Sequence, residues 1–184
     1  MQAFNVRPAP TEHPVAPIRR LAQLFAALSP EDLVRLPEVY AEHAEFSDPF
    51  NHVHGVAAIE ILFRHMFERL ENPRFEVLHA LGDQHEAMLT WDFRFRFRSA
   101  WLQPAGSPDQ CIHGATFVAF AADGRVQIHR DYWDAADQFY AKVPGLGWLM
   151  RALKRAAAAD IPAALGSGAP RHGADDSAKR AQTR

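Results

Sequence analysis

Apolar residues recur at the spacing of amphipathic helices in the first third of the chain. This spacing predicts one helix from about Ile18 to Leu28. Ser29-Pro30, with Asp32 three residues after the serine, resembles a capping box and predicts a second helix, which Pro37 should kink or restart. The clearest helix follows Gly55, and Asn72-Pro73 is expected to end it. Its apolar stripe consists of Ile59, Leu62, Phe63, Met66, Phe67 and Leu70.

From Arg74 onward the apolar period changes to two, which is typical of strands. The expected strands cover residues 74–84, 89–98, 111–120 and 125–134. The second is the strongest signal in the chain, because apolar and polar residues alternate strictly along it. Its apolar face carries Leu89, Trp91, Phe93, Phe95 and Phe97, and its polar face Thr90, Asp92, Arg94, Arg96 and Arg98. Helices followed by a run of antiparallel strands predict an α+β fold with the helices on one face of the sheet.

Composition places the chain among ordinary globular proteins of one domain. It has 184 residues, with 20 Lys+Arg against 22 Asp+Glu, so its net charge of −2 gives no reason to expect nucleic acid as a partner. One cysteine excludes an intramolecular disulfide framework. Neither a secretory signal nor an apolar stretch long enough to span a membrane is present, so the expected compartment is the cytoplasm.

The pattern also divides the chain. We expect a flexible, proline-rich arm over residues 1–16, a domain over 17–143, a C-terminal helix over 144–159 and a disordered tail over 160–184. The C-terminal helix carries an apolar stripe beside a few basic residues. Such a helix suits packing over another part of the protein, and it also suits weak contact with a membrane surface.

Three groups of residues, in this order and spacing, resemble the nuclear transport factor 2-like superfamily, nearest its SnoaL-like and ketosteroid-isomerase-like branch. They are Tyr40-Ala41…Phe46-Ser47-Asp48-Pro49, then Gly55-Val56-Ala57-Ala58-Ile59, then Phe120…Asp123-Gly124-Arg125-Val126…Tyr132-Trp133. The resemblance runs from about Ile18 to Tyr140. It implies a cone, in which a curved mixed sheet wraps around three helices and an apolar cavity opens at one end. It also implies a homodimer.

The resemblance implies roles for single residues as well. Asp48 falls where the isomerases keep their proton-abstracting carboxylate, Trp133 matches a tryptophan of the cavity wall, and Tyr40 matches a supporting tyrosine. The oxyanion donors of the isomerases correspond here to Leu24 and Thr116, and a further tyrosine corresponds to Phe63. Since leucine donates no hydrogen bond and threonine is a weaker donor than a carboxylic acid, we do not expect a true ketosteroid isomerase. Asp48 has a second interpretation, because an aspartate in Asp-Pro-Phe-Asn can cap its own turn.

The last strand adds an acid–base pair. Alternation places Gln127, His129, Asp131 and Trp133 on one face. If Trp133 lines the cavity, His129 and Asp131 line it too, and a histidine beside a carboxylate can transfer protons near neutral pH. The alternative is that this face meets solvent or a dimer partner, where the pair is an ordinary surface ion pair.

Two other features have competing interpretations. Trp91 and Phe93 could line a ligand pocket with Tyr40, Phe63, Thr116 and Trp133, although an aromatic row of this kind also suits a plain core. His52-Val53-His54 could place two imidazoles on one face, with His113, or His129 and Asp131, completing a metal site. Nothing in the sequence fixes that spacing, so we predict no metal site.

The sequence therefore predicts a domain that binds a small hydrophobic molecule in an apolar cavity. The leading hypothesis is an isomerase, cyclase or dehydratase without an organic cofactor, since no phosphate-binding glycine loop is present, with Asp48, His129 and Asp131 as catalytic residues. The alternative is a non-catalytic binding or accessory module that uses the same cavity.

Overall fold

The computed structural model describes residues 9–140 and 146–157. Short helical segments come first, six strands with one long helix among them follow, and two helices end the described chain. Their bounds are η1 Pro10–Glu12, α1 Ala16–Ala27, η2 Pro30–Arg35, α2 Leu36–Val39, β1 Tyr40–Ser47, β2 His52–His54, α3 Val56–Arg69, β3 Leu70–Gly82, β4 Glu86–Phe97, β5 Gln110–Phe120, β6 Val126–Trp133, α4 Ala135–Gln138 and α5 Gly147–Ala157, where η marks a 3₁₀ helix.

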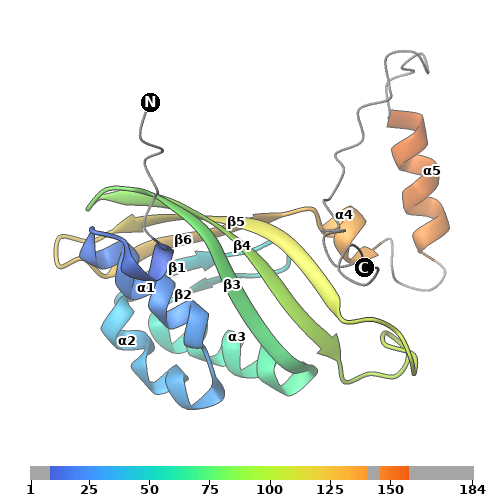
Figure 1. The fold of residues 1–184 in the computed structure, drawn as a ribbon, viewed down its shortest axis with the longest axis horizontal. Helices are drawn as coiled ribbons and strands as arrows, with labels where there is room; N and C mark the ends of the chain where they lie inside the picture. Colours follow the sequence, from blue (N-terminus) through green and yellow to red (C-terminus); the bar gives the residue numbers. More distant parts are fainter. Residues whose placement is uncertain (1–8, 141–145, 158–184) are drawn as a thin grey trace, which may run out of the picture.

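The six strands form one mixed sheet in the order β2-β1-β6-β5-β4-β3. β1 pairs with β6 in parallel, and the other neighbours pair antiparallel. The sheet is strongly curved, and α1, α2 and α3 lie on one side of it (Figure 1). The predicted α+β class and the curved sheet around three helices are confirmed.

The main core lies between the helices and the sheet. Ile18 and Leu21 of α1, Leu36 of α2 and Ile59 of α3 have no exposed surface. The alternation along β4 is confirmed, because Leu89, Trp91, Phe93 and Phe95 are all buried. Asp92 is buried on the opposite face, where His113 and Arg94 bind its carboxylate.

One predicted boundary was wrong. The third helix ends at Arg69 rather than at Asn72-Pro73, and β3 runs straight through these two residues. β3 is an edge strand, and its register with β4 shifts between Glu71 and Arg74. A proline is tolerated in such a strand because no ladder partner requires its missing N–H. Asn72 adopts a φ of 49° at the same irregularity.

The second predicted helix is mostly 3₁₀. The Asp32 carboxylate accepts hydrogen bonds from the backbone N–H and the hydroxyl of Ser29, as the capping-box pattern predicts. Pro37 stands at the start of α2, so the predicted restart is confirmed. Tyr40 directly follows α2 and begins β1.

The two ends of the chain are described in part. Within the predicted arm, Pro10–Glu12 form a 3₁₀ turn, and Gln23 of α1 donates a hydrogen bond to the Thr11 carbonyl. The predicted C-terminal helix is present as α5, which exposes Trp148 and Leu153. The predicted tail, 160–184, lies outside the described residues. Over the described ranges, no helix is long and apolar enough to cross a membrane.

Candidate active site

A cavity of about 520 Å³ opens between the sheet, α3 and the turn that joins β1 to β2. Nine aromatic rings of Phe and Trp line it, from strands, helices and the turn. The full lining is Phe46, Asp48, Phe50, Asn51, Val53, Ala58, Ile61, Leu62, Phe63, His65, Met66, Leu70, Phe75, Phe93, Phe95, Phe97, Ile112, Asp131, Trp133 and Phe139. Among these described lining residues there is no Lys or Arg, so the cavity favours uncharged or cationic molecules over anions.

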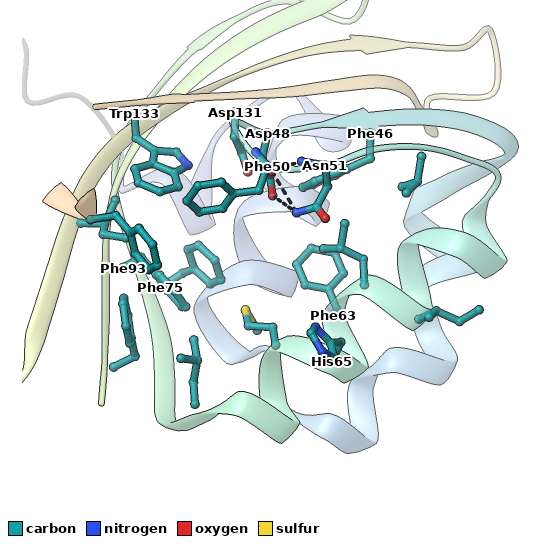
Figure 2. A pocket seen from close by; sticks show the side chains of 18 of the residues that line it. Phe46, Asp48, Phe50, Asn51, Phe63, His65, Phe75, Phe93, Asp131 and Trp133 are labelled. Carbon is teal, nitrogen blue, oxygen red and sulfur yellow. Dashed lines mark hydrogen bonds between the residues drawn. The ribbon is translucent and has the colours of Figure 1, made fainter. Parts of the chain in front are cut away.

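Asp131 is the carboxylate that the last strand presents to this cavity. Figure 2 shows it beside Trp133 and Asp48, with Phe63 and His65 of α3 across the cavity. Its Oδ1 accepts hydrogen bonds from the Thr116 hydroxyl at 2.5 Å and from His129 Nε2 at 3.0 Å. Both bonds end on Oδ1, which leaves Oδ2 as the oxygen that can contact a ligand.

His129 forms a hydrogen bond with Asp131 behind the cavity wall. Its side chain is 1% exposed, and its Nδ1 lies 2.9 Å from the Tyr40 hydroxyl. An ionised Asp131 only accepts, so the neutral imidazole carries its proton on Nε2 and Nδ1 accepts from Tyr40. The Phe46 ring stacks on the imidazole at a centroid distance of 4.6 Å, which fixes its plane. Asp131 and Trp133 line the cavity, as the alternation along β6 predicts. His129 was expected on the same wall, and this was wrong: it lines only the small inner pocket behind the cavity.

Thr116 receives a hydrogen bond as well as donating one. Trp91 Nε1 donates to its Oγ1 at 2.8 Å, and the hydroxyl proton then points to Asp131. This hydroxyl is therefore committed to the carboxylate rather than available to an oxyanion. Leu24, at the other position that the resemblance singles out, is buried in the core.

Tyr40 remains a hydrogen-bond donor over the whole working pH range. Burial, with a further contribution from the Asp131 carboxylate, raises the pKa of its hydroxyl well above the ordinary value of 10.0. Tyr40 lines neither the cavity nor the small inner pocket behind it. The prediction of Tyr40 as a pocket residue was therefore wrong. Its hydroxyl contacts His129 instead.

We expect Tyr40→Phe to lower the free energy of unfolding by about 1–3 kcal/mol at neutral pH, because His129 Nδ1 loses its buried donor. A group whose pKa is raised on folding stabilises fully below its unfolded pKa and loses this contribution above it. The deficit of the variant should therefore shrink as the pH rises above about 10. Urea unfolding across this range measures it, and Tyr132→Phe, at an exposed site, is the control. A deficit that stays constant with pH would contradict the account.

Asp48 has a different environment. Its Oδ1 accepts from the backbone N–H groups of Phe50 and Asn51, both at 2.7 Å, and the Asn51 side chain donates to both carboxylate oxygens. The carboxylate lines the cavity and also closes the turn between β1 and β2 (Figure 2). This geometry matches the turn-capping interpretation, and it leaves Asp48 less free than Asp131 to accept a proton.

The structure divides the other predicted pocket residues between two spaces. Phe63, Phe93 and Trp133 line the cavity, whereas Trp91 and Thr116 line the small inner pocket that Asp131 also borders. Phe95 and Phe97, which belong to the same aromatic row of β4 as Phe93, line the cavity beside it. The sequence did not predict Phe46, Phe50, Phe75 and Phe139 as lining residues, because they come from separate elements that only the fold brings together.

Trp133 and His65 line the cavity and carry N–H groups. Trp133 Nε1 donates to no acceptor within residues 9–140 and 146–157, and its indole lines the wall two residues from Asp131. His65 accepts from Arg69 Nε on its Nε2 at 3.2 Å, so its neutral ring carries the proton on Nδ1. The lining thus combines the Asp131 carboxylate with the N–H groups of an indole and an imidazole.

Comparison with known proteins identifies the fold and the family. The profile of the SnoaL-like domain matches residues 21–129, which is more than half of the chain. The chain therefore belongs to the SnoaL-like family, with a nuclear transport factor 2-like, ketosteroid isomerase-like fold. No curated protein matches the chain.

Solved structures share the fold at low sequence identity. An LEH-like epoxide hydrolase from M. tuberculosis is 19% identical with a TM-score of 0.54, over 76% of this chain and 96% of its own. A Catenulispora acidiphila protein with a ketosteroid isomerase-like fold, in complex with trimethylamine, is 13% identical with a TM-score of 0.56, over 70% and 94%. An NTF2-like protein of unknown function from Exiguobacterium is 15% identical with a TM-score of 0.52, over 64% and 98%.

Proposed function

We propose that this protein is an enzyme that transfers a proton on a small, uncharged, hydrophobic molecule, with Asp131 as the general base. The observation that carries the proposal is the Asp131 carboxylate on the wall of an aromatic cavity, held through Oδ1 and open at Oδ2. A general base must reach the proton that it removes, and an oxygen on the cavity wall can do so.

The reaction that fits is isomerisation, cyclisation or dehydration of a carbonyl compound. Asp131 Oδ2 takes a proton from the carbon next to the carbonyl, and the C–H electron pair moves toward the carbonyl oxygen to form an enolate. In an isomerisation the protonated Asp131 returns the proton at another carbon, and in a dehydration it gives the proton to the departing hydroxyl group. In a cyclisation the enolate carbon attacks a second carbonyl carbon of the substrate, and the protonated Asp131 gives its proton to the alkoxide that forms. Each step balances within the substrate and the carboxyl group.

His129 and Thr116 hold the base in place. Their two hydrogen bonds fix the Asp131 side chain, and Tyr40 and Trp91 in turn fix the His129 tautomer and the Thr116 hydroxyl. A base whose partners are already ordered needs no rearrangement when the proton moves. We therefore assign His129, Thr116 and Tyr40 as positioning residues rather than catalytic ones.

Trp133 supplies the donor for the developing negative charge. Residues 131 and 133 point the same way from β6, and alternate residues of a strand lie about 6.6 Å apart. We expect a substrate that places a C–H group at Asp131 Oδ2 to have its neighbouring carbonyl oxygen near Trp133 Nε1. The indole N–H thus takes the role for which Leu24 and Thr116 are unsuited.

We expect the wild-type chain to open the ring of 5-nitrobenzisoxazole, a flat apolar probe that reacts when a base removes its single acidic C–H proton. The rate should exceed that of the same concentration of acetate, and Trp133→Phe should lower kcat about tenfold by removing the N–H donor. Absorbance of the released nitrophenolate measures both. A probe that binds without reacting faster than in acetate would contradict the enzyme proposal.

A binding module is the second candidate. Asp48 and Thr116 already form hydrogen bonds within the protein, so fewer polar groups remain for catalysis. This observation favours a binding module. The Catenulispora protein of the same fold is in complex with trimethylamine, and aromatic rings with carboxylates suit a small cation of this kind. A module of this kind would bind the probe and trimethylamine without turning over the probe.

A further inference from the structure

We propose that Glu45, His52 and His54 form a binding site for a first-row transition-metal ion of the zinc type. The three side chains lie on the outside of the β1–β2 hairpin, away from the cavity. Their potential ligand atoms all lie within 4.8 Å of one another. The argument for this site does not rest on the proposed enzyme function.

The strand register brings the three residues together. β1 and β2 pair antiparallel, with Glu45 opposite His54 and Ser47 opposite His52. His52 and His54 are two residues apart on the edge strand, so they share one face, and Glu45 reaches both from β1. Val53 and Phe46, which alternate with them, face the cavity. The metal-ligating groups are thus on the opposite face of the same two strands.

The donor set matches what zinc binds. Two imidazole nitrogens and one carboxylate oxygen leave a fourth position for water, as in sites with three protein ligands. His52 Nε2 already lies 3.1 Å from Glu45 Oε1, and the two imidazole centroids are 4.9 Å apart. Tetrahedral zinc with bonds of about 2.0–2.1 Å holds its ligand atoms about 3.3 Å apart, so small rotamer changes complete the site. His52 and Glu45 are partly exposed, with side-chain exposures of 54% and 32%, which permits such changes.

The surroundings leave the ligands available. Within the described ranges, the ion pair of Glu45 is with His52, and His54 takes part in no hydrogen bond or ion pair with another side chain. The contacts among two exposed imidazoles and one carboxylate add little to the stability of the fold, because water screens them. A divalent cation would engage all three at once.

A second cluster, Asp92, Cys111 and His113, is a poorer site. His113 Nδ1 binds Asp92 Oδ1 at 2.6 Å, and Arg94 binds Asp92 Oδ2 at 3.1 Å. The carboxylate is thus engaged through both oxygens, and the guanidinium would repel a metal cation. This cluster provides the rival for the test.

A metal at the hairpin would act on the cavity through the turn. Residues 48–51 join β1 to β2, and Asp48, Phe50 and Asn51 of this turn line the cavity. A metal bound to both strands directly behind the turn would hold the two strands together. We therefore expect zinc to stabilise the folded chain by mass action.

The test is calorimetric titration of the full-length chain, free of any affinity tag, with ZnCl₂. We expect one saturable site in the wild type, and at least tenfold weaker binding in Glu45→Gln and in His54→Gln. His79→Gln, at an exposed histidine of β3, is the matched control and should bind zinc as the wild type does. His113→Gln reports on the rival cluster and should also leave the affinity unchanged.

Two results would overturn the proposal: a wild-type chain without saturable zinc binding, or binding that His113→Gln weakens and His54→Gln does not. NMR of the histidine side chains in the wild type gives a second measurement that needs no variant. Zinc should shift the imidazole resonances of His52 and His54, and a shift confined to other histidines contradicts the site. Neither measurement depends on turnover, so failure of the metal site and failure of the proposed enzyme function are distinguishable.

Discussion

Asp131→Asn is expected to lower turnover of 5-nitrobenzisoxazole at least about 100-fold, because an amide cannot accept the substrate proton. Asparagine has the same shape as aspartate, and its carbonyl oxygen can still accept from Thr116 and His129. The cavity should therefore keep its form while losing its base. Initial rates at saturating probe measure the loss in kcat.

The control for this variant is binding. 5-Nitroindole is flat and apolar like the probe but has no acidic C–H for Asp131 to remove, so it competes for the cavity without reacting. We expect Asp131→Asn to bind it within a few-fold of the wild-type affinity. A variant that keeps its turnover would remove Asp131 from the catalytic role, whatever its affinity.

Gly114→Ala is expected to lower the free energy of unfolding by about 3 kcal/mol, at the upper end of the cost of overpacking. A Cβ at residue 114 would lie 2.3 Å from Cη2 and 2.5 Å from Cζ2 of Trp91. Trp91 is 7% exposed and donates to Thr116, so the ring cannot move away without breaking that hydrogen bond. Chemical denaturation measures the difference in unfolding free energy.

Gly106→Ala is the comparison for this prediction. Gly106 has a φ of 80°, but nothing lies within 4 Å of a Cβ built there. Its substitution should cost only the backbone penalty of about 1–2 kcal/mol. Equal losses in the two variants would mean that the Trp91 contact contributes no steric cost at Gly114.

The alternation of apolar and polar residues predicted which side chains of β4 and β6 share a face. Strict alternation along residues 89–97 placed four of five apolar side chains in the interior, and the same period on the last strand placed Asp131 and Trp133 on one face. The path of β3 was missed because Asn72-Pro73 normally stops regular structure. Its tolerance depends on the strand being at the sheet edge, which no local pattern reveals.

The candidate site could not be predicted in full from the sequence, because its contacts depend on turn geometry and strand register. The sequence offered both interpretations of Asp48, and the hydrogen bonds within its turn distinguish them. The histidines at 52 and 54 were visible as a pair, but Glu45 became their neighbour only through the register of β1 with β2. Thr116 and Asp131 are 15 residues apart in sequence, and the pairing of β5 with β6 places them opposite each other.

The central claim is that Asp131, rather than Asp48, is the base in the cavity. The most direct test compares kcat/KM for 5-nitrobenzisoxazole in Asp131→Asn and Asp48→Asn, since both substitutions remove one negative charge from the same cavity. The account predicts a loss of at least about 100-fold for Asp131→Asn and a loss of only a few-fold for Asp48→Asn, whose amide can still cap the turn. A large loss in Asp48→Asn with turnover retained in Asp131→Asn would contradict it.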